Sequence, residues 1–175
     1  MAGIDHPGRR QFLTDDRDSS GRRSRFRQRT RASERRRARA RARILHETLH
    51  GTLQVMHRDF FREDDGTRIP SRSLADVFSE LEKSYEIKLQ WLAVDTKAMH
   101  IDHEPQTDFE KAAVAAFKAD ESEYEQVDGD AYRYAGRIRL SAVCLTCHLS
   151  RRSNNNDRSA ALTITMPWAK HRAGE

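Results

Sequence analysis

Two cysteines and a histidine stand together near the end of the chain, in the order Cys144-Leu145-Thr146-Cys147-His148. They include both of the cysteines that the 175 residues contain. The C-x-x-C-H spacing lets two thiols form thioethers to the vinyl groups of one haem, and it places the following histidine to ligate the iron. The motif therefore predicts one covalently attached c-type haem per chain, with His148 as its proximal ligand.

Two other kinds of site use the same atoms. Zinc could be bound by Cys144, Cys147 and His148, but it needs a fourth ligand, usually from a second cysteine or histidine cluster, and the sequence has none. A thioredoxin-like dithiol normally opens a helix, whereas residues 149–157 read as a loop. A haem-free zinc or dithiol redox module at Cys144 and Cys147 stays open as an alternative.

The positive charge of the chain is concentrated near its start. Residues 1–43 hold 15 arginines and five acidic residues, a net charge of +10, whereas the whole chain carries +5, so residues 44–175 carry −5. A polar composition without periodicity predicts a disordered Arg-rich segment over residues 1–40, although residues 31–43 are compatible with a helix. We expect residues 41–168 to form the folded domain and residues 169–175 to form a tail.

The arginines of residues 22–43 suggest a second class of function, binding to nucleic acid or to an anionic membrane surface by charge neutralisation. No aromatic interleaving or binding motif accompanies the charge, so a solvated tail is the simpler interpretation. A membrane surface is the better candidate of the two partners.

The predicted haem also predicts the cellular location of the protein, because bacterial c-type haem is attached outside the cytoplasm. We therefore expect a periplasmic or otherwise exported protein. The sequence around Arg9-Arg10 resembles a twin-arginine export motif, but acidic residues follow it in place of an apolar stretch. No apolar run long enough for a transmembrane helix is present.

From Ile44 the apolar pattern is helical. One stripe recurs at three- and four-residue steps: Leu45, Leu49, Leu53, Met56 and Phe60. A second stripe close beside it holds His46, His50 and His57. An apolar wall flanked by imidazoles suits a haem pocket, and we predict His57 as the second axial ligand. The competing candidates are Met56, Met99, His100, His103 and an open or water-ligated site.

The remaining pattern alternates between helix and strand signals. A second helix follows the turn residues 61–73, with its buried face at Leu74, Val77, Phe78 and Leu81. Residues 87–95 predict a strand and residues 99–105 a polar loop. A third helix, capped by Thr107 or Asp108, turns five residues inward: Phe109, Ala112, Ala113, Ala116 and Phe117.

Further strands are predicted over residues 123–127, after the turn at residues 128–130, and over residues 160–166. In the middle strand one face is apolar and holds Tyr132, Tyr134, Ile138 and Leu140. The opposite face holds Arg133, Arg137 and Arg139, which we interpret as a solvated face, with haem propionates as alternative partners. Helices followed by hairpin-linked strands predict an α+β domain with an antiparallel sheet.

The order of these elements around the motif matches a known pattern. It is carried by LHETLHGTLQVMHRDFF (45–61), IPSRSLADVFSEL (69–81), WLAVDTKAMHIDHEPQTDFEKAA (91–113), YRYAGRIRL (132–140), CLTCH (144–148) and AALTITMP (160–167). The chain resembles the mono-haem c-type domains with a PAS-like fold, long catalogued as a domain of unknown function.

The resemblance implies a PAS-like antiparallel sheet with a long N-terminal helix and two or three further helices. It implies a covalent haem in the loop before the last strand, used to sense redox state or a diatomic ligand, or to pass single electrons to a redox partner protein. The sequence holds no nucleophile elbow, phosphate loop or paired-carboxylate motif, so we expect no enzymatic turnover.

Overall fold

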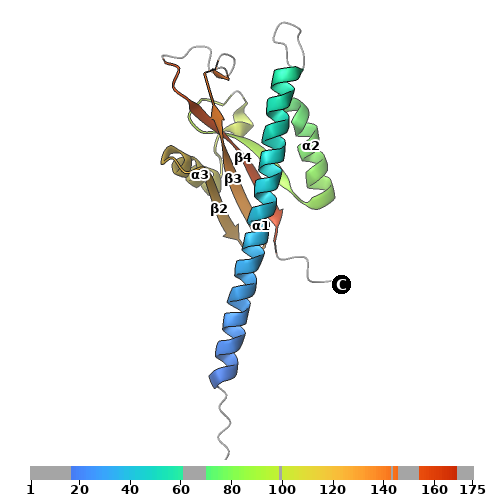
Figure 1. Ribbon diagram of the computed structural model, residues 1–175, viewed down its shortest axis with the longest axis vertical. Helices are drawn as coiled ribbons and strands as arrows, with labels where there is room; N and C mark the ends of the chain where they lie inside the picture. The colour runs from blue at the N-terminus through green and yellow to red at the C-terminus, as the bar shows by residue number, and fades with distance from the viewer. Residues whose placement is uncertain (1–16, 61–69, 99, 143, 146–153, 169–175) are drawn as a thin grey trace, which may run out of the picture. The chain divides into compact units, whose positions relative to one another are not determined.

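The computed structural model describes residues 17–60, 70–98, 100–142, 144–145 and 154–168. The chain divides into two compact units, residues 1–34 and residues 35–175. The elements in chain order are α1 (Arg17–Asp59), α2 (Pro70–Tyr85), β1 (Lys88–Ala93), the 3-10 turn η2 (Ile101–His103), α3 (Asp108–Lys118), β2 (Glu123–Asp128), β3 (Ala131–Leu140) and β4 (Arg158–Pro167) (Figure 1).

The four strands form one sheet in the order β1-β4-β3-β2, and every neighbouring pair is antiparallel. Strands β2 and β3 make a hairpin in which Asp128 pairs with Ala131. Gly129 takes a φ of +58° in the two-residue turn between them, a conformation that favours glycine. The predicted α+β fold with an antiparallel sheet is confirmed.

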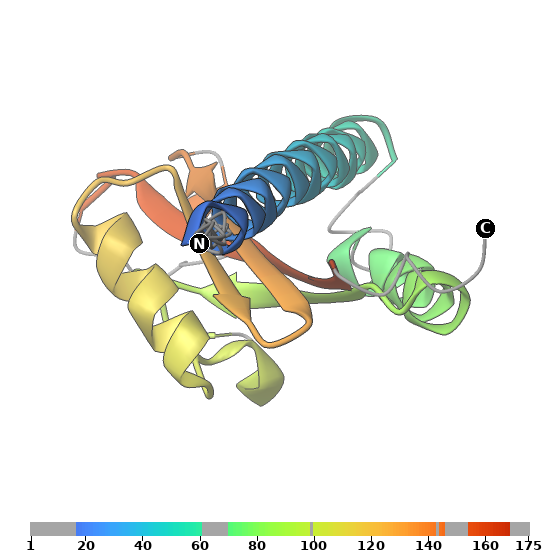
Figure 2. The ribbon, with the colours of Figure 1, turned by 90° about the horizontal axis from the view of Figure 1, so that it is seen from below.

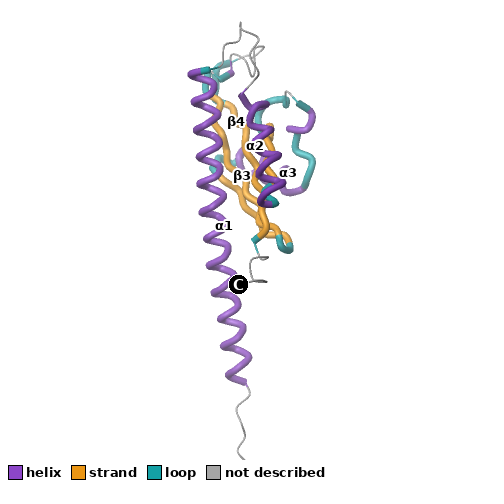
Figure 3. Tube along the Cα trace, turned by 90° about the vertical axis from the view of Figure 1, so that its right-hand side faces the viewer, coloured by secondary structure: helices purple, strands orange, loops and turns teal. Residues whose placement is uncertain are grey.

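Helices cover both faces of this sheet (Figures 2 and 3). Because side chains alternate along a strand, β3 and β4 supply two cores. The larger core joins β3 and β4 to α2 and to the half of α1 that follows Glu34, and it includes Tyr132, Ile138, Leu162, Ile164 and Met166. The smaller core lies under α3 and includes Phe109, Ala113, Phe117, Ala135 and Ala161.

Residues 17–40, which lie in the segment predicted to be disordered, belong to helix α1. Arginine and alanine are both good helix formers, and the buried Ala38 and Ala42 attach this half of the helix to the larger core. The first compact unit ends at Glu34 and the second begins at Arg35.

Two side chains assigned to buried faces are exposed instead. Phe60 follows the last residue of α1 and is 72% exposed, and Val77 is 43% exposed on α2. The core face of α2 is narrower than predicted and centres on Leu74 and Phe78. In α3 the predicted cap is confirmed, since Thr107 and Glu110 form a reciprocal capping box.

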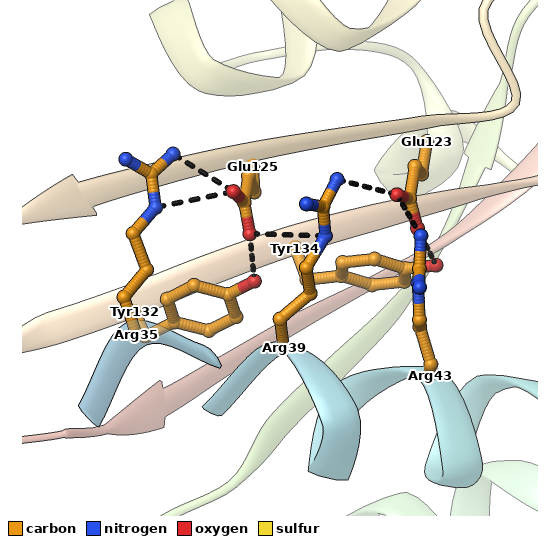
Figure 4. Close-up of polar contacts among 7 residues, drawn as sticks. All are labelled: Arg35, Arg39, Arg43, Glu123, Glu125, Tyr132 and Tyr134. Carbon is orange, nitrogen blue, oxygen red and sulfur yellow. Dashed lines mark hydrogen bonds and ion pairs between the residues drawn. The ribbon is translucent and has the colours of Figure 1, made fainter. Parts of the chain in front are cut away.

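Three arginines spaced one turn apart fix α1 to β2, the edge strand of the sheet (Figure 4). Arg35 Nη2 lies 2.8 Å from Glu125 Oε1, and Arg39 Nη2 lies 2.5 Å from Glu123 Oε1. Arg43 Nε donates to Glu123 Oε2 at 2.7 Å. We call these five residues, together with Tyr132 and Tyr134 of β3, the arginine–glutamate ladder.

The two tyrosines bind the same carboxylates from β3. Tyr132 donates its hydroxyl to Glu125, and Tyr134 donates to Glu123 Oε2 at 3.1 Å. Burial, reinforced by these carboxylates, raises the pKa of both tyrosines above the ordinary value, so both hydroxyls stay protonated as donors. The ladder therefore sets the rotation of α1 about its own axis and the position of α1 along the strands of the sheet.

The ladder predicts a loss of stability in acid. The hydrogen bond from Arg43 holds the pKa of Glu123 below its usual value. A carboxylate with a lowered pKa stabilises the fold fully above its unfolded-state pKa, and the stabilisation is lost as pH falls through the folded-state pKa. We expect Glu123→Gln to lower the free energy of unfolding by about 1–3 kcal/mol at neutral pH, and by less below about pH 4.

Urea denaturation at neutral and acidic pH measures this difference. Glu121→Gln is the matched control, because Glu121 is exposed and lies two residues before Glu123. A Glu123→Gln protein that loses as much stability on acidification as the parent would contradict the assignment.

Candidate functional site

The first cysteine of the motif lies just beyond β3, on the side of the sheet that α1 and α2 cover. Leu145 is fully buried in the larger core, and Cys144 is partly buried against the same core. The amide of Leu145 donates to the carbonyl of Ser141 at 3.1 Å, and Ser141 Oγ lies 3.6 Å from Cys144 Sγ. Cys147 and His148 lie outside the described residues, so their assigned roles stay predictions.

His46 is the most deeply buried of the three histidines on α1, with only 3% of its surface exposed. Its ring lies directly on Gly136 of β3, where a Cβ atom would come within 2.8 Å of His46 Cγ and still closer to Nε2 and Cδ2. The absence of a side chain at Gly136 therefore creates the space that His46 occupies.

One nitrogen of His46 has no hydrogen-bond partner among the described residues. Nδ1 lies 3.1 Å from Glu47 Oε1, whereas Nε2 is buried and makes no hydrogen bond to any residue that the structure describes. A buried polar atom left without a partner costs about 1–3 kcal/mol, and native structures keep few of them. This nitrogen is therefore a candidate ligand atom.

Two further rings lie beside His46. The ring centroids of His50 and Tyr134 lie 5.8 Å and 6.1 Å from the centroid of His46. Burial, and the nearby His46, lower the pKa of His50, so it is neutral at physiological pH. His50 Nε2 lies 2.8 Å from Gln54 Nε2. The structure thus brings His46 and His50 together, with Tyr134 linking them to the arginine–glutamate ladder.

His57, the predicted second axial ligand, lies on the same helix nearer its end. It is partly buried, and its Nδ1 lies 2.9 Å from the carbonyl oxygen of Leu53. An Nδ1–H that donates to this carbonyl leaves Nε2 as the basic nitrogen, the usual tautomer of a metal-bound histidine. Its role stays a prediction. Met56, a competing candidate, is partly buried against the larger core.

The histidines of the η2 turn lie on a different face of the sheet. His100 and His103 stand at the two ends of this turn, with ring centroids 5.6 Å apart. Gln90 of β1, whose side chain points to the face that α3 covers, donates to the Asp102 carbonyl of this turn at 2.7 Å. The structure therefore places this histidine pair on the opposite side of the sheet from His46. Met99 lies outside the described residues.

The strand arginines also lie on that opposite side, and two of them correct the interpretation of a solvated face. Arg137 is covered by α3: its side chain is 10% exposed, and it binds Asp120 Oδ1 at 2.8 Å and the Phe117 carbonyl at 3.3 Å. Arg133 binds Asp128 at 3.1 Å. Both point away from the core that holds Cys144, so their placement gives no support to propionate binding. Arg139 is exposed, as predicted.

Two negative findings apply to the described part of the chain. It contains no group of three or more His, Cys, Asp or Glu side chains placed to hold a metal ion. None of its helices has the length and apolar character that crossing a membrane requires. The zinc hypothesis depends on Cys147 and His148, and therefore falls outside the described residues.

The sequence analysis placed His46 on the histidine stripe but predicted His57 as the second axial ligand. The missed signal was Gly136, a glycine inside an otherwise well-formed strand, which often marks a close approach of another group. Which helix residue lies over that glycine depends on how α1 crosses the sheet, and that crossing is set by the arginine–glutamate ladder.

Comparisons with known proteins show which family this chain belongs to. A family model described as Tll0287-like matches residues 30–167. No curated protein matches the sequence. The crystal structure of the cyanobacterial heme-protein Tll0287 matches with a TM-score of 0.53 and 18% identity, covering 69% of this chain and 89% of that chain. At this identity the likeness shows a shared fold, which agrees with the predicted PAS-like architecture. Since the family model spans most of the sequence, the chain belongs to the Tll0287-like family.

Proposed function

We propose that this chain carries one covalently bound haem c and serves in one-electron transfer or redox sensing. Cys144 and Cys147 would form the two thioethers, and His148 would be the proximal ligand. Three observations support the proposal: the C-x-x-C-H spacing, membership of the Tll0287-like family, and a shared fold with a protein described as a heme-protein.

The observation that carries the proposal furthest is the buried His46, whose Nε2 has no hydrogen-bond partner in the part of the chain that the structure describes. It belongs to the side of the sheet against which Cys144 also packs, and an imidazole nitrogen is a common haem iron ligand. The residues present therefore fit a haem, and we propose His46 as the second axial ligand in place of His57. His50, whose ring lies beside it, is the nearest competitor.

The surrounding residues would tune the site. When bound, the haem would supply a one-electron couple at its iron. Glu47, at 3.1 Å from Nδ1, would orient the imidazole and keep Nε2 as the basic nitrogen. Gly136 would hold the ring against the sheet. If His148 and His46 both hold the iron, the site would favour redox work over the binding of a diatomic ligand.

The proposal implies export, since bacterial cytochrome c maturation takes place outside the cytoplasm, and it implies a redox partner protein. It describes electron transfer or sensing rather than turnover of a substrate.

Covalent attachment is tested on protein that is exported in a host with cytochrome c maturation machinery. We expect the denatured chain to retain the mass of one haem and to give a c-type pyridine haemochrome spectrum. The Cys144→Ser/Cys147→Ser double variant should have the unmodified mass, because thioethers cannot form. A colourless parent protein with both thiols open to alkylation would refute the proposal and favour a zinc or dithiol module.

A further inference from the structure

We propose that the exposed arginines in the first half of α1 bind the phosphate headgroups of an anionic phospholipid membrane. The site lies wholly within the first unit, residues 1–34. We call it the arginine segment and define it by five exposed residues: Arg23, Arg25, Arg27, Arg29 and Arg31.

Three of the six arginines between residues 35 and 43 of the same helix are engaged in the folded unit. Arg35, Arg39 and Arg43 are paired with Glu123 and Glu125 in the ladder, so these two carboxylates balance two of the three positive charges inside the folded unit. Between residues 21 and 33 the sequence has no acidic residue. The positive charge of the arginine segment is therefore available to an anionic partner.

The helix concentrates this charge. Residues 23–31 rise about 12 Å along the axis, at about 1.5 Å per residue, and their arginines are distributed around the helix. The segment contains one large apolar side chain, Phe26, which is 71% exposed. An aromatic ring among cations suits the headgroup region, where the ring enters the interface and long arginine side chains reach the phosphates.

Nucleic acid offers the same phosphate chemistry, and the choice between the two partners rests on the proposed function. A chain that acquires haem c works outside the cytoplasm, where a lipid surface is the polyanion available to it. Phe26 favours the same choice, because it gives the segment a group that a bilayer interface can accept.

Flotation of the haem-loaded protein with lipid vesicles tests the proposal. We expect binding to vesicles that contain phosphatidylglycerol, little binding to phosphatidylcholine vesicles, and weaker binding as salt rises. Arg25→Gln/Arg27→Gln/Arg29→Gln should weaken binding by about 100-fold, since each arginine near the surface contributes about one factor of five. Phe26→Ala should weaken it several-fold.

The matched control removes the same charge from the folded unit. Lys88→Gln/Lys97→Gln/Lys111→Gln neutralises three exposed lysines, and its binding should stay within about threefold of the parent. If both triple variants lose vesicle binding equally, the proposal is overturned in favour of an effect of net charge. Displacement from the vesicles by a short duplex DNA at equal phosphate concentration would overturn it in favour of nucleic acid.

The haem-free Cys144→Ser/Cys147→Ser protein separates the two proposals. If the parent carries haem and does not bind vesicles, the membrane proposal alone fails. If the parent lacks haem but binds vesicles as the double variant does, the proposed function fails and the headgroup site stands.

Discussion

Replacement of His46 by alanine is expected to convert the proposed haem-loaded protein from a six-coordinate, low-spin ferric form to a high-spin form. The proposed ligand atom is lost, and a buried cavity that alanine cannot fill remains over Gly136. The conversion should be nearly complete, and absorption and electron paramagnetic resonance spectra would measure it. Added imidazole should restore the low-spin spectrum, because it can enter that cavity.

Two further variants decide which histidine is the ligand. His57→Ala and His50→Ala should both keep the low-spin spectrum. If His57→Ala becomes high-spin while His46→Ala does not, the sequence-based prediction of His57 is correct and the assignment of His46 is wrong. If none of the three changes the spectrum, the ligand lies outside this histidine stripe, and Met56 becomes the first candidate on α1.

Substitution of Gly136 by alanine is expected to lower the free energy of unfolding by about 1–3 kcal/mol, the usual range for overpacking a core. The added Cβ would overlap the His46 ring, which rests on the backbone here. The φ angle of Gly136 is not in the positive region, so the loss is steric. In a His46→Ala background the same substitution should cost much less, and urea denaturation of the four proteins measures the coupling.

Two other glycines serve as controls, because alanine should raise the stability of the protein at one of them and lower it at the other. Gly51 lies inside α1 with open space around a would-be Cβ, so Gly51→Ala should stabilise the protein by about 0.5–1 kcal/mol. Gly129→Ala should be destabilising because of its positive φ, regardless of residue 46. If His46→Ala does not reduce the loss of stability that Gly136→Ala causes, the two residues are not packed as described.

Local patterns predicted most of the elements correctly. Alternation in β3 separates Tyr132 and Tyr134 from Arg133 and Arg137, and the predicted hairpin between β2 and β3 is present. The helix over Asp108–Lys118 begins at the predicted cap. These features depend on neighbours within a few positions, which a single sequence contains.

The candidate site depends on contacts between distant positions, and there the sequence was less informative. His46 meets Gly136 only because α1 crosses the sheet at one particular height. Arg39 looked like part of a solvated tail because its partners, Glu123 and Glu125, follow it by more than eighty residues. The position of β2 at the sheet edge, which brings these glutamates to α1, follows from the strand order and not from any local pattern.

The central position of β4 has a consequence for the order of events during biosynthesis. Both β1 and β3 pair with β4, so neither strand has its full complement of partners until residues 158–167 have been made. The two cysteines precede that stretch in the sequence. A nascent or translocating chain would therefore contain both cysteines while the sheet is still open, and pairing of β4 with β1 and β3 would then complete the sheet.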